Sequence, residues 1–152
     1  MFFLKKKLKR ILCSYVELKN IQNDCQLVFI GDGLLKKEAE LFTSCHKIKD
    51  VNFLGFLPQT EIYKFYKSLK VFILPSTEGE TWGIVFLEAM AAGCPVSTCS
   101  LCGVTEFIKH NKHAWIVDDP YNQSEKTDAI INLYHNNELQ KRLSHFGKKL
   151  TK

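Results

Sequence analysis

The feature that most constrains the fold is an alternation of short apolar runs with segments of helical periodicity along the 152-residue chain. The apolar runs predict strands at residues 26–30, 51–54, 71–74, from 96 onward and at 114–117. Apolar residues at helical spacing fill residues 8–19, 34–44, 60–69 and 83–92, with one or two helical turns at 103–109. Strands that alternate with helices in this way predict βαβ units, and hence a parallel sheet with helices on both faces.

We therefore expect a Rossmann-like, doubly wound α/β fold, and the length is typical of one domain over residues 1–152. Asn122 with Glu125, and Asn137 with Gln140, resemble capping boxes that would begin two closing helices. In such sheets, ligands bind beyond the carboxyl ends of the strands. The rule directs attention to the segments that follow residues 30, 54, 74 and 96.

The charge is concentrated at one end of the chain. There are 21 basic and 16 acidic residues, and the first ten positions hold five basic residues and no acid. Those five are Lys5, Lys6, Lys7, Lys9 and Arg10, three of them in a basic N-terminal segment, residues 1–7. The cluster is typical of a helix that touches anionic membrane lipid, and equally of a solvated helix end. Because the remaining residues are balanced in charge, nucleic acid is not an expected partner.

The sequence also bears on the compartment. Residues 89–105 carry no charge, but Gly93, Pro95 and Gly103 break this stretch, so it is not expected to span a membrane. The basic N-terminal segment is not followed by an apolar h-region, which argues against a secretory signal. Six irregularly spaced cysteines suggest reduced thiols and a cytoplasmic protein. Cys99 and Cys102, which precede two histidines, do not have the spacing of a common zinc site.

The most informative segment is residues 75–95, PSTEGETWGIVFLEAMAAGCP. Glu88 is the only charged residue between Glu80 and Glu106, in a helix that is otherwise apolar. Because an unpaired buried carboxylate is costly, Glu88 must be satisfied in some way. Either this helix face reaches solvent, or Glu88 accepts hydrogen bonds from a ligand that carries hydroxyl groups.

The loop before that helix ends in Gly83, at the point where the helix begins. Exposed N–H groups and the positive end of the helix dipole favour a phosphate there. A carboxylate at Glu80 would be repelled by a phosphate unless it served another part of the ligand, such as a sugar hydroxyl. The combination of a phosphate site with carboxylates for a sugar and a ribose indicates a nucleotide-sugar site.

The pattern PS-x3-E-x-x-G-I-V-x-x-E-A-M-A-x-G-x-P-V in this segment resembles the signature of the retaining GT-B glycosyltransferases of family 4. The resemblance extends to Gly103-x-x-Glu106 and back to Gly31-Asp32-Gly33, to Val51-x-Phe53-x-Gly55 and to VFILPS at residues 71–76. It covers nearly all of residues 8–150 and implies the C-terminal, donor-binding half of a GT-B architecture.

The resemblance implies a role for each matching residue. Glu80 would contact the hydroxyls of the donor sugar as the catalytic residue, positioning the sugar rather than attacking it. The backbone at Thr81, Trp82, Gly83, Ile84 and Val85 would hold the diphosphate, and Glu88 would bind the ribose. The turn Gly55-Phe56-Leu57 would lie against the base, and Trp82 could shape the sugar pocket or cover the loop. Family members need no metal and retain the anomeric configuration.

The sequence departs from the family pattern in several places. Cys102 stands where a glycine is usual, Lys6 or Lys7 matches the phosphate-binding lysine, and no residue matches the arginine beside it. The acceptor-binding N-terminal domain of the family is not part of these residues. We therefore expect no sugar transfer unless that half is supplied in cis or in trans.

Two classes of function follow from these observations. The first is the donor-binding part of a hexosyltransferase, which would use a nucleotide sugar such as a UDP-sugar, and which in this family often serves cell-envelope polysaccharide synthesis. The second is a non-catalytic nucleotide-sugar-binding module, or one subunit of a split transferase. A sugar-nucleotide epimerase on the same architecture is less well supported, since the motifs resemble those of transferases.

Overall fold

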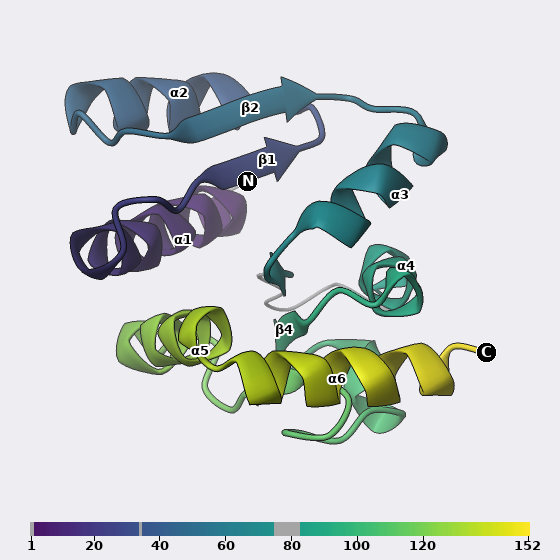
Figure 1. Ribbon diagram of the computed structural model, residues 1–152. Coiled ribbons are helices and arrows are strands. Elements are labelled where there is room, and N and C mark those ends of the chain that lie inside the picture. The colour runs from purple at the N-terminus through teal and green to yellow at the C-terminus, as the bar shows by residue number, and fades with distance from the viewer. Residues whose placement is uncertain (1, 34, 75–82) are drawn as a thin grey trace. The chain divides into compact units, whose positions relative to one another are not determined.

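The structure is a computed structural model that describes residues 2–33, 35–74 and 83–152, with side chains from residue 8 onward (Figure 1). The elements in chain order are α1 (Phe2–Ile21), β1 (Leu27–Ile30), α2 (Lys36–Cys45), β2 (Val51–Gly55), α3 (Gln59–Ser68), β3 (Phe72–Ile73), α4 (Ile84–Ala92), β4 (Val96–Cys99), η1 (Gly103–Glu106), β5 (Trp115–Val117), α5 (Gln123–His135) and α6 (Asn137–Leu150). The predicted order of helices and strands is confirmed. The chain forms two compact units, Met1–Gln59 and Thr60–Lys152, which are described separately.

The first unit contains a parallel pair of strands, β1 and β2, with the helices α1 and α2. Phe29 lies opposite Phe53 across the pair, and their rings stack with centroids 5.0 Å apart. After this pair the register shifts, so that Ile30 is opposite Gly55. The helix α2 packs on β2, and α1 contacts α2, so both helices are anchored to this two-stranded sheet (Figure 1).

The helix α1 is held by one apolar stripe and by polar contacts near its C-terminal end. Its buried apolar residues are Ile11, Leu12, Tyr15 and Leu18, close to the predicted spacing. The hydroxyl of Tyr15 lies 3.1 Å from each of the carbonyl oxygens of Cys25, Lys49 and Asp50. Lys19 Nζ lies 2.6 Å from the Asp50 carboxylate, and this hydrogen-bonded pairing raises the pKa of Lys19. These contacts fix the end of α1 against the segment that enters β2.

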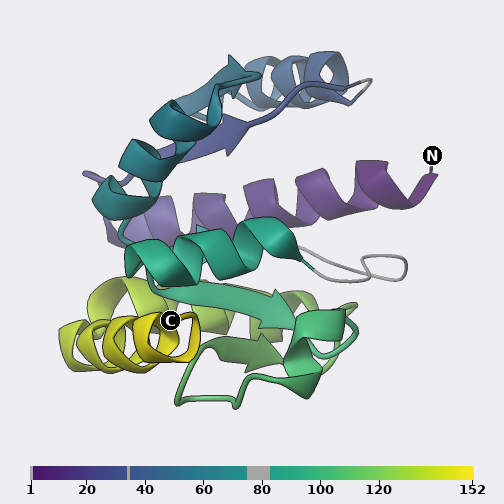
Figure 2. The same ribbon diagram turned by 90° about the vertical axis from the view of Figure 1, so that its right-hand side faces the viewer.

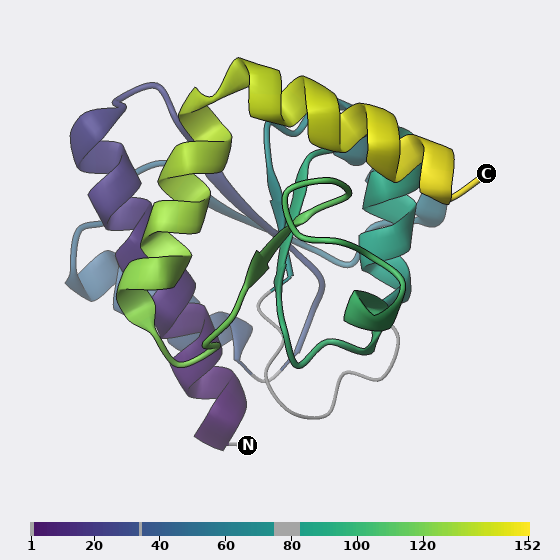
Figure 3. The ribbon, with the colours of Figure 1, turned by 90° about the horizontal axis from the view of Figure 1, so that it is seen from below.

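The second unit is built on a parallel sheet with the strand order β3-β4-β5. The middle strand, β4, is buried along its whole length, as expected for a parallel strand covered on both faces. Along β5, Ile116 packs into the apolar cluster of α4, whereas Val117 packs with Cys99 and with Ala129 of α5. Since neighbouring residues of a strand point to opposite faces, helices cover both faces of this sheet (Figures 2 and 3). The predicted α/β fold class is confirmed.

The helix α4 carries the predicted site and also forms part of the core. Phe86, Ala89 and Met90 are completely buried in the main apolar cluster of the second unit. The helix α6 packs closely on it, because a Cβ at Gly147 would lie only 3.3 Å from Met90 Cε. Among the described residues, no helix is both long enough and apolar enough to cross a membrane.

The helix caps agree with the sequence in one case and differ in the other. The Asn122 side chain accepts a hydrogen bond from the Glu125 N–H at 3.2 Å, as predicted for the start of α5. At the start of α6 the prediction of Asn137 is wrong by one residue, since Asn136 accepts from the Leu139 N–H at 2.9 Å. Asn136 has an extended backbone and is both the C-cap of α5 and the N-cap of α6. The sequence pattern did not distinguish two adjacent asparagines.

Candidate functional site

The start of α4 has the geometry predicted for an anion site. Gly83 precedes the helix with a left-handed backbone, φ 57° and ψ 48°. The first backbone bond of the helix runs from the Phe86 N–H to the Gly83 carbonyl oxygen at 2.8 Å, so the N–H groups of Ile84 and Val85 precede it. The side chains of Ile84 and Val85 are exposed, by 67% and 41%. This helix end therefore presents early N–H groups and the positive end of the dipole at an exposed position.

Glu88 lies one turn further along α4 and is half-buried. The hydroxyl of Tyr66 lies 3.5 Å from Glu88 Oε2 and donates toward it. Burial and, after it, the negative charge of Glu88 together raise the pKa of Tyr66 to about 12. The sequence left two explanations for this charge, access to solvent or hydrogen bonds from a ligand. In the structure Glu88 has partial access to solvent, and it also has a protein partner in Tyr66.

Glu88 also faces a cavity of about 620 Å³ in the second unit. The other residues that line the cavity are Ile84, Leu87, Ala91, Val104, Phe107, Leu150 and Thr151. They come from α4, from η1 and the residue after it, and from the last residue of α6 and the residue after it. Glu88 is the one charged residue among these lining residues, so its carboxylate is the one charged acceptor they offer to a hydroxyl group that enters this cavity.

The structure brings part of the predicted diphosphate and ribose site together. Gly83, Ile84 and Val85 form the start of α4, and Glu88 follows on the same helix. The predicted Glu80, Thr81 and Trp82 lie outside the described residues, and so does the side chain of Lys6, which belongs to α1. The roles predicted for these residues stay predictions.

The predicted base-binding turn lies in the first unit. Gly55 ends β2 with φ 71°, and the next residue, Phe56, has a side chain that is 82% exposed. Leu57 follows and is half-buried. The Gly31 N–H donates to the Gly55 carbonyl oxygen at 2.7 Å, which joins this turn to the loop after β1. The two loops therefore meet at the carboxyl end of the strand pair, where ligands bind in parallel sheets.

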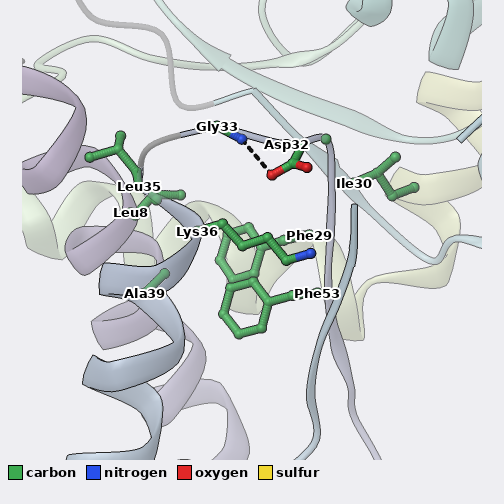
Figure 4. Close-up of a pocket in the computed structure, with 10 residues that line it drawn as sticks. Leu8, Phe29, Ile30, Asp32, Gly33, Leu35, Lys36, Ala39 and Phe53 are labelled. Atoms are coloured by element: carbon green, nitrogen blue, oxygen red, sulfur yellow. Dashed lines mark hydrogen bonds between the residues drawn. The ribbon is translucent and has the colours of Figure 1, made fainter. Parts of the chain in front are cut away.

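A second cavity, of about 480 Å³, opens beside these loops in the first unit (Figure 4). Apolar side chains form most of its lining, and Asp32 and Lys36 supply the charged groups. Sequence reasoning missed Lys36, although the rule that pointed to the segment after residue 30 could have found it. The sequence around Lys36 did not single it out, since a lysine at an exposed position of a helix is common.

The cysteines of the CxxC segment show no sign of reactive chemistry. Cys99 and Cys102 are buried and unbridged, and burial raises the pKa of the Cys99 thiol. His113 Nδ1 accepts a hydrogen bond from the Lys109 N–H at 3.0 Å. In the part of the chain that the structure describes, no three or more His, Cys, Asp or Glu side chains are grouped as a metal would need.

The fold is that of the Rossmann-like C-terminal domains of one class of proteins, the GT-B glycosyltransferases. The family profile described as "Glycosyl transferases group 1" matches residues 1–150. The chain therefore belongs to the glycosyl transferases group 1 family.

Individual proteins agree with this assignment. The sulfoquinovosyl transferase SQD2 of Arabidopsis thaliana is 36% identical over 110 residues, which cover 72% of this chain and 18% of SQD2. A mutant of S. aureus TarM, in complex with fondaparinux, alpha-GlcNAc-glycerol and UDP, matches with a TM-score of 0.83 at 20% identity, covering 93% of this chain and 28% of TarM. The C-terminal domain of LpcC from Francisella tularensis matches at TM-score 0.79 and 22% identity, covering 93% of this chain and 75% of that domain. The first curated relatives are matched over 18–28% of their own lengths.

Proposed function

We propose that this chain is the donor-binding, C-terminal domain of a retaining family 4 glycosyltransferase that transfers a hexose-type sugar from a UDP-sugar to an acceptor. The observation that carries the proposal is the start of α4, where the N–H groups of the exposed residues Ile84 and Val85 precede a carboxylate one turn away. The UDP in the TarM complex supports a nucleotide-linked donor, and the name of the Arabidopsis relative, a sulfoquinovosyl transferase, supports the transfer of a sugar group.

In this proposal, α4 stabilises the departing diphosphate. The N–H groups near Ile84 and Val85 and the positive end of the helix dipole lie where negative charge would develop. Such fixed dipoles lower the barrier because they need no reorganisation as the bond to the sugar breaks. Glu88 would accept hydrogen bonds from the ribose hydroxyls, Glu80 would orient the sugar, and Lys6 would add a positive charge to the phosphates. No metal is needed in this scheme.

The acceptor would be recognised by a further GT-B domain, in cis or in trans, and without that domain we expect no sugar transfer. Synthesis of cell-envelope polysaccharides is the context we propose for the whole enzyme, in the cytoplasm. The test is an assay of transfer to added acceptors with and without such a domain from a relative. Sugar transfer by this chain alone would contradict the proposal that a further domain is needed to bind the acceptor.

We further propose that the basic cluster of α1 touches the inner face of the membrane. Its members are Lys5, Lys6, Lys7, Lys9 and Arg10. Lys9 is exposed, although its ammonium group also lies 5.6 Å from the ring centroid of Phe42 on α2. We expect co-sedimentation with vesicles of anionic lipid that is lost at high salt and with neutral lipid, because screening weakens such contacts. Equal binding to both lipids would contradict this proposal.

The donor proposal is tested by titration with UDP and UDP-glucose, followed by NMR of the backbone amides. We expect shifts at residues 83–88. Glu88→Gln removes a charged acceptor of hydrogen bonds and should weaken both ligands by about tenfold to a hundredfold. The matched control is Glu138→Gln, at an exposed glutamate near the start of α6, which should leave the affinity unchanged.

Two outcomes would contradict the assigned roles. If Glu88→Gln lowers the melting temperature by many degrees and leaves the affinity of the folded protein intact, Glu88 is structural. If Glu80→Gln weakens UDP as strongly as UDP-glucose, Glu80 does not face the sugar.

A further inference from the structure

Tyr66 connects the apolar core of the second unit with the carboxylate of Glu88. Its side chain is only 4% exposed and belongs to the apolar cluster that contains Phe86 and Met90 of α4. Its ring meets the ring of Phe72 edge to face, with centroids 5.5 Å apart and an interplanar angle of 89°. Such close packing fixes the position of the ring, and therefore also the position of the hydroxyl group that the ring carries.

The fixed hydroxyl group of Tyr66 is a donor to Glu88. It lies 3.5 Å from Glu88 Oε2, and the contact joins α3 to α4. Because burial and the charge of Glu88 hold the pKa of Tyr66 at about 12, the hydroxyl keeps its proton near neutral pH. The last torsion of a glutamate side chain has only a broad preference of its own, so a donor in a fixed position restricts how the carboxylate is turned.

The bond from Tyr66 leaves Glu88 able to bind a ligand. Glu88 lines the cavity of about 620 Å³ in the second unit. An ionised carboxylate has about four acceptor positions on its two oxygens, so one donor does not use up its capacity. A group whose orientation is already restricted loses less conformational freedom when a ligand binds, which favours binding.

We propose that Tyr66 is a positioning residue, whose hydroxyl group orients the carboxylate of Glu88 for the hydroxyl groups of the donor. This inference rests on the proposed function, in which Glu88 accepts hydrogen bonds from the ribose. Tyr66 does not contact the donor in this scheme and acts only through Glu88. The bond of 3.5 Å is long, and it should shorten when ribose hydroxyls hold the carboxylate, as hydrogen bonds in binding sites often do.

The first test removes the hydroxyl group of Tyr66 and keeps its ring. Tyr66→Phe should weaken the binding of UDP about threefold to tenfold, measured by NMR or calorimetric titration of the whole chain. The melting temperature should change little, because the ring still packs against Phe72. The matched control is Tyr63→Phe, which removes a hydroxyl group from an exposed tyrosine of the same helix and should leave the affinity for UDP unchanged.

Inorganic pyrophosphate separates positioning from a purely structural role. It carries two phosphates and no ribose, so it can use the start of α4 but has no hydroxyl groups for Glu88. Tyr66→Phe should therefore weaken UDP and leave the affinity for pyrophosphate unchanged. If both ligands are weakened equally, Tyr66 supports the fold of α4 as a whole, and the positioning role is refuted.

A double-mutant cycle shows whether Tyr66 acts through Glu88. Once Glu88→Ala has removed the carboxylate, adding Tyr66→Phe should cause no further loss of affinity for UDP, because nothing is left to orient. Losses that add up in the double variant would overturn the inference, since Tyr66 would then act independently of Glu88.

The contact itself has a spectroscopic signature. Glu88→Gln keeps the shape of the side chain and removes its charge, so it should lower the pKa of Tyr66 in an alkaline absorbance titration. An unchanged pKa would show that the two groups do not interact.

The inference and the proposed function can fail separately. If Glu88→Ala weakens UDP and Tyr66→Phe does not, the donor site stands and the role of Tyr66 is refuted. If UDP does not bind, or if Glu88→Ala leaves its affinity unchanged, the proposed role of Glu88 fails, and the inference fails with it.

Discussion

Replacing Gly83 by alanine tests how the start of α4 is built. Gly83 has φ 57°, in the left-handed region, where a non-glycine residue costs about 1–2 kcal/mol. The added Cβ would also lie 3.3 Å from Cys102 Sγ and 3.3 Å from Leu74 Cδ2, a close approach to two side chains that must shift slightly. We therefore expect Gly83→Ala to lower the free energy of unfolding by about 1–3 kcal/mol.

The assay is thermal unfolding followed by circular dichroism. For a chain of this size, the loss corresponds to a fall of about 3–10 °C in melting temperature. The matched control is Gly33→Ala, because Gly33 has no left-handed φ and nothing within 4 Å of an added Cβ. This control should leave the melting temperature unchanged or raise it slightly. If the two variants unfold at the same temperature, the left-handed start of α4 is not a requirement of the fold.

Three further predictions concern the second unit. Thr98→Val should keep or raise the melting temperature, because in the described part of the chain the buried Thr98 hydroxyl has no hydrogen-bond partner; a loss above about 1 kcal/mol would contradict this. In an alkaline absorbance titration, the unmodified chain should show one tyrosine that ionises near pH 12, and Tyr66→Phe should remove it. If all five tyrosines of the unmodified chain ionise near pH 10, Tyr66 is not buried as described. Burial, together with the charges of Lys112 and Lys109, lowers the pKa of His113. The free energy of unfolding should therefore be highest above pH ~6.5 and should fall as the pH drops below that value. If His113→Gln shows an equally steep fall, His113 is not the cause.

The order of elements was predictable because hydrophobic periodicity reports which side of each element is buried. The spacing in α1 predicted the burial of Ile11, Leu12 and Tyr15, and the apolar residues of the segment 83–92 predicted a helix there. The boundaries were less accurate, because they depend on local contacts. The cap of α6 is one residue earlier than predicted, since two adjacent asparagines satisfy the same pattern equally well.

For the candidate site, the sequence predicted the local structure but not the contacts. Gly83 was expected where a helix begins and Glu88 within that helix, and the structure confirms both positions, whereas the roles of these residues stay predictions. The proximity of Lys36 to Gly55 could not be predicted, since it depends on the pairing of β1 with β2 and on how α2 packs against them. The partner of Glu88 was missed for the same reason, because Tyr66 lies on another helix.

The close packing of Gly147 against Met90 has a consequence for how long the start of α4 stays formed. A Cβ at residue 147 would lie 3.3 Å from Met90 Cε and 3.4 Å from the His113 carbonyl oxygen, so α6 fits on α4 with little free space. Helices that fit this closely open together in local unfolding. The amides of α4 should then exchange with solvent no faster than those of α6. The lifetime of the N-terminal end of α4 is in that case set by a helix that begins more than fifty residues further along the chain.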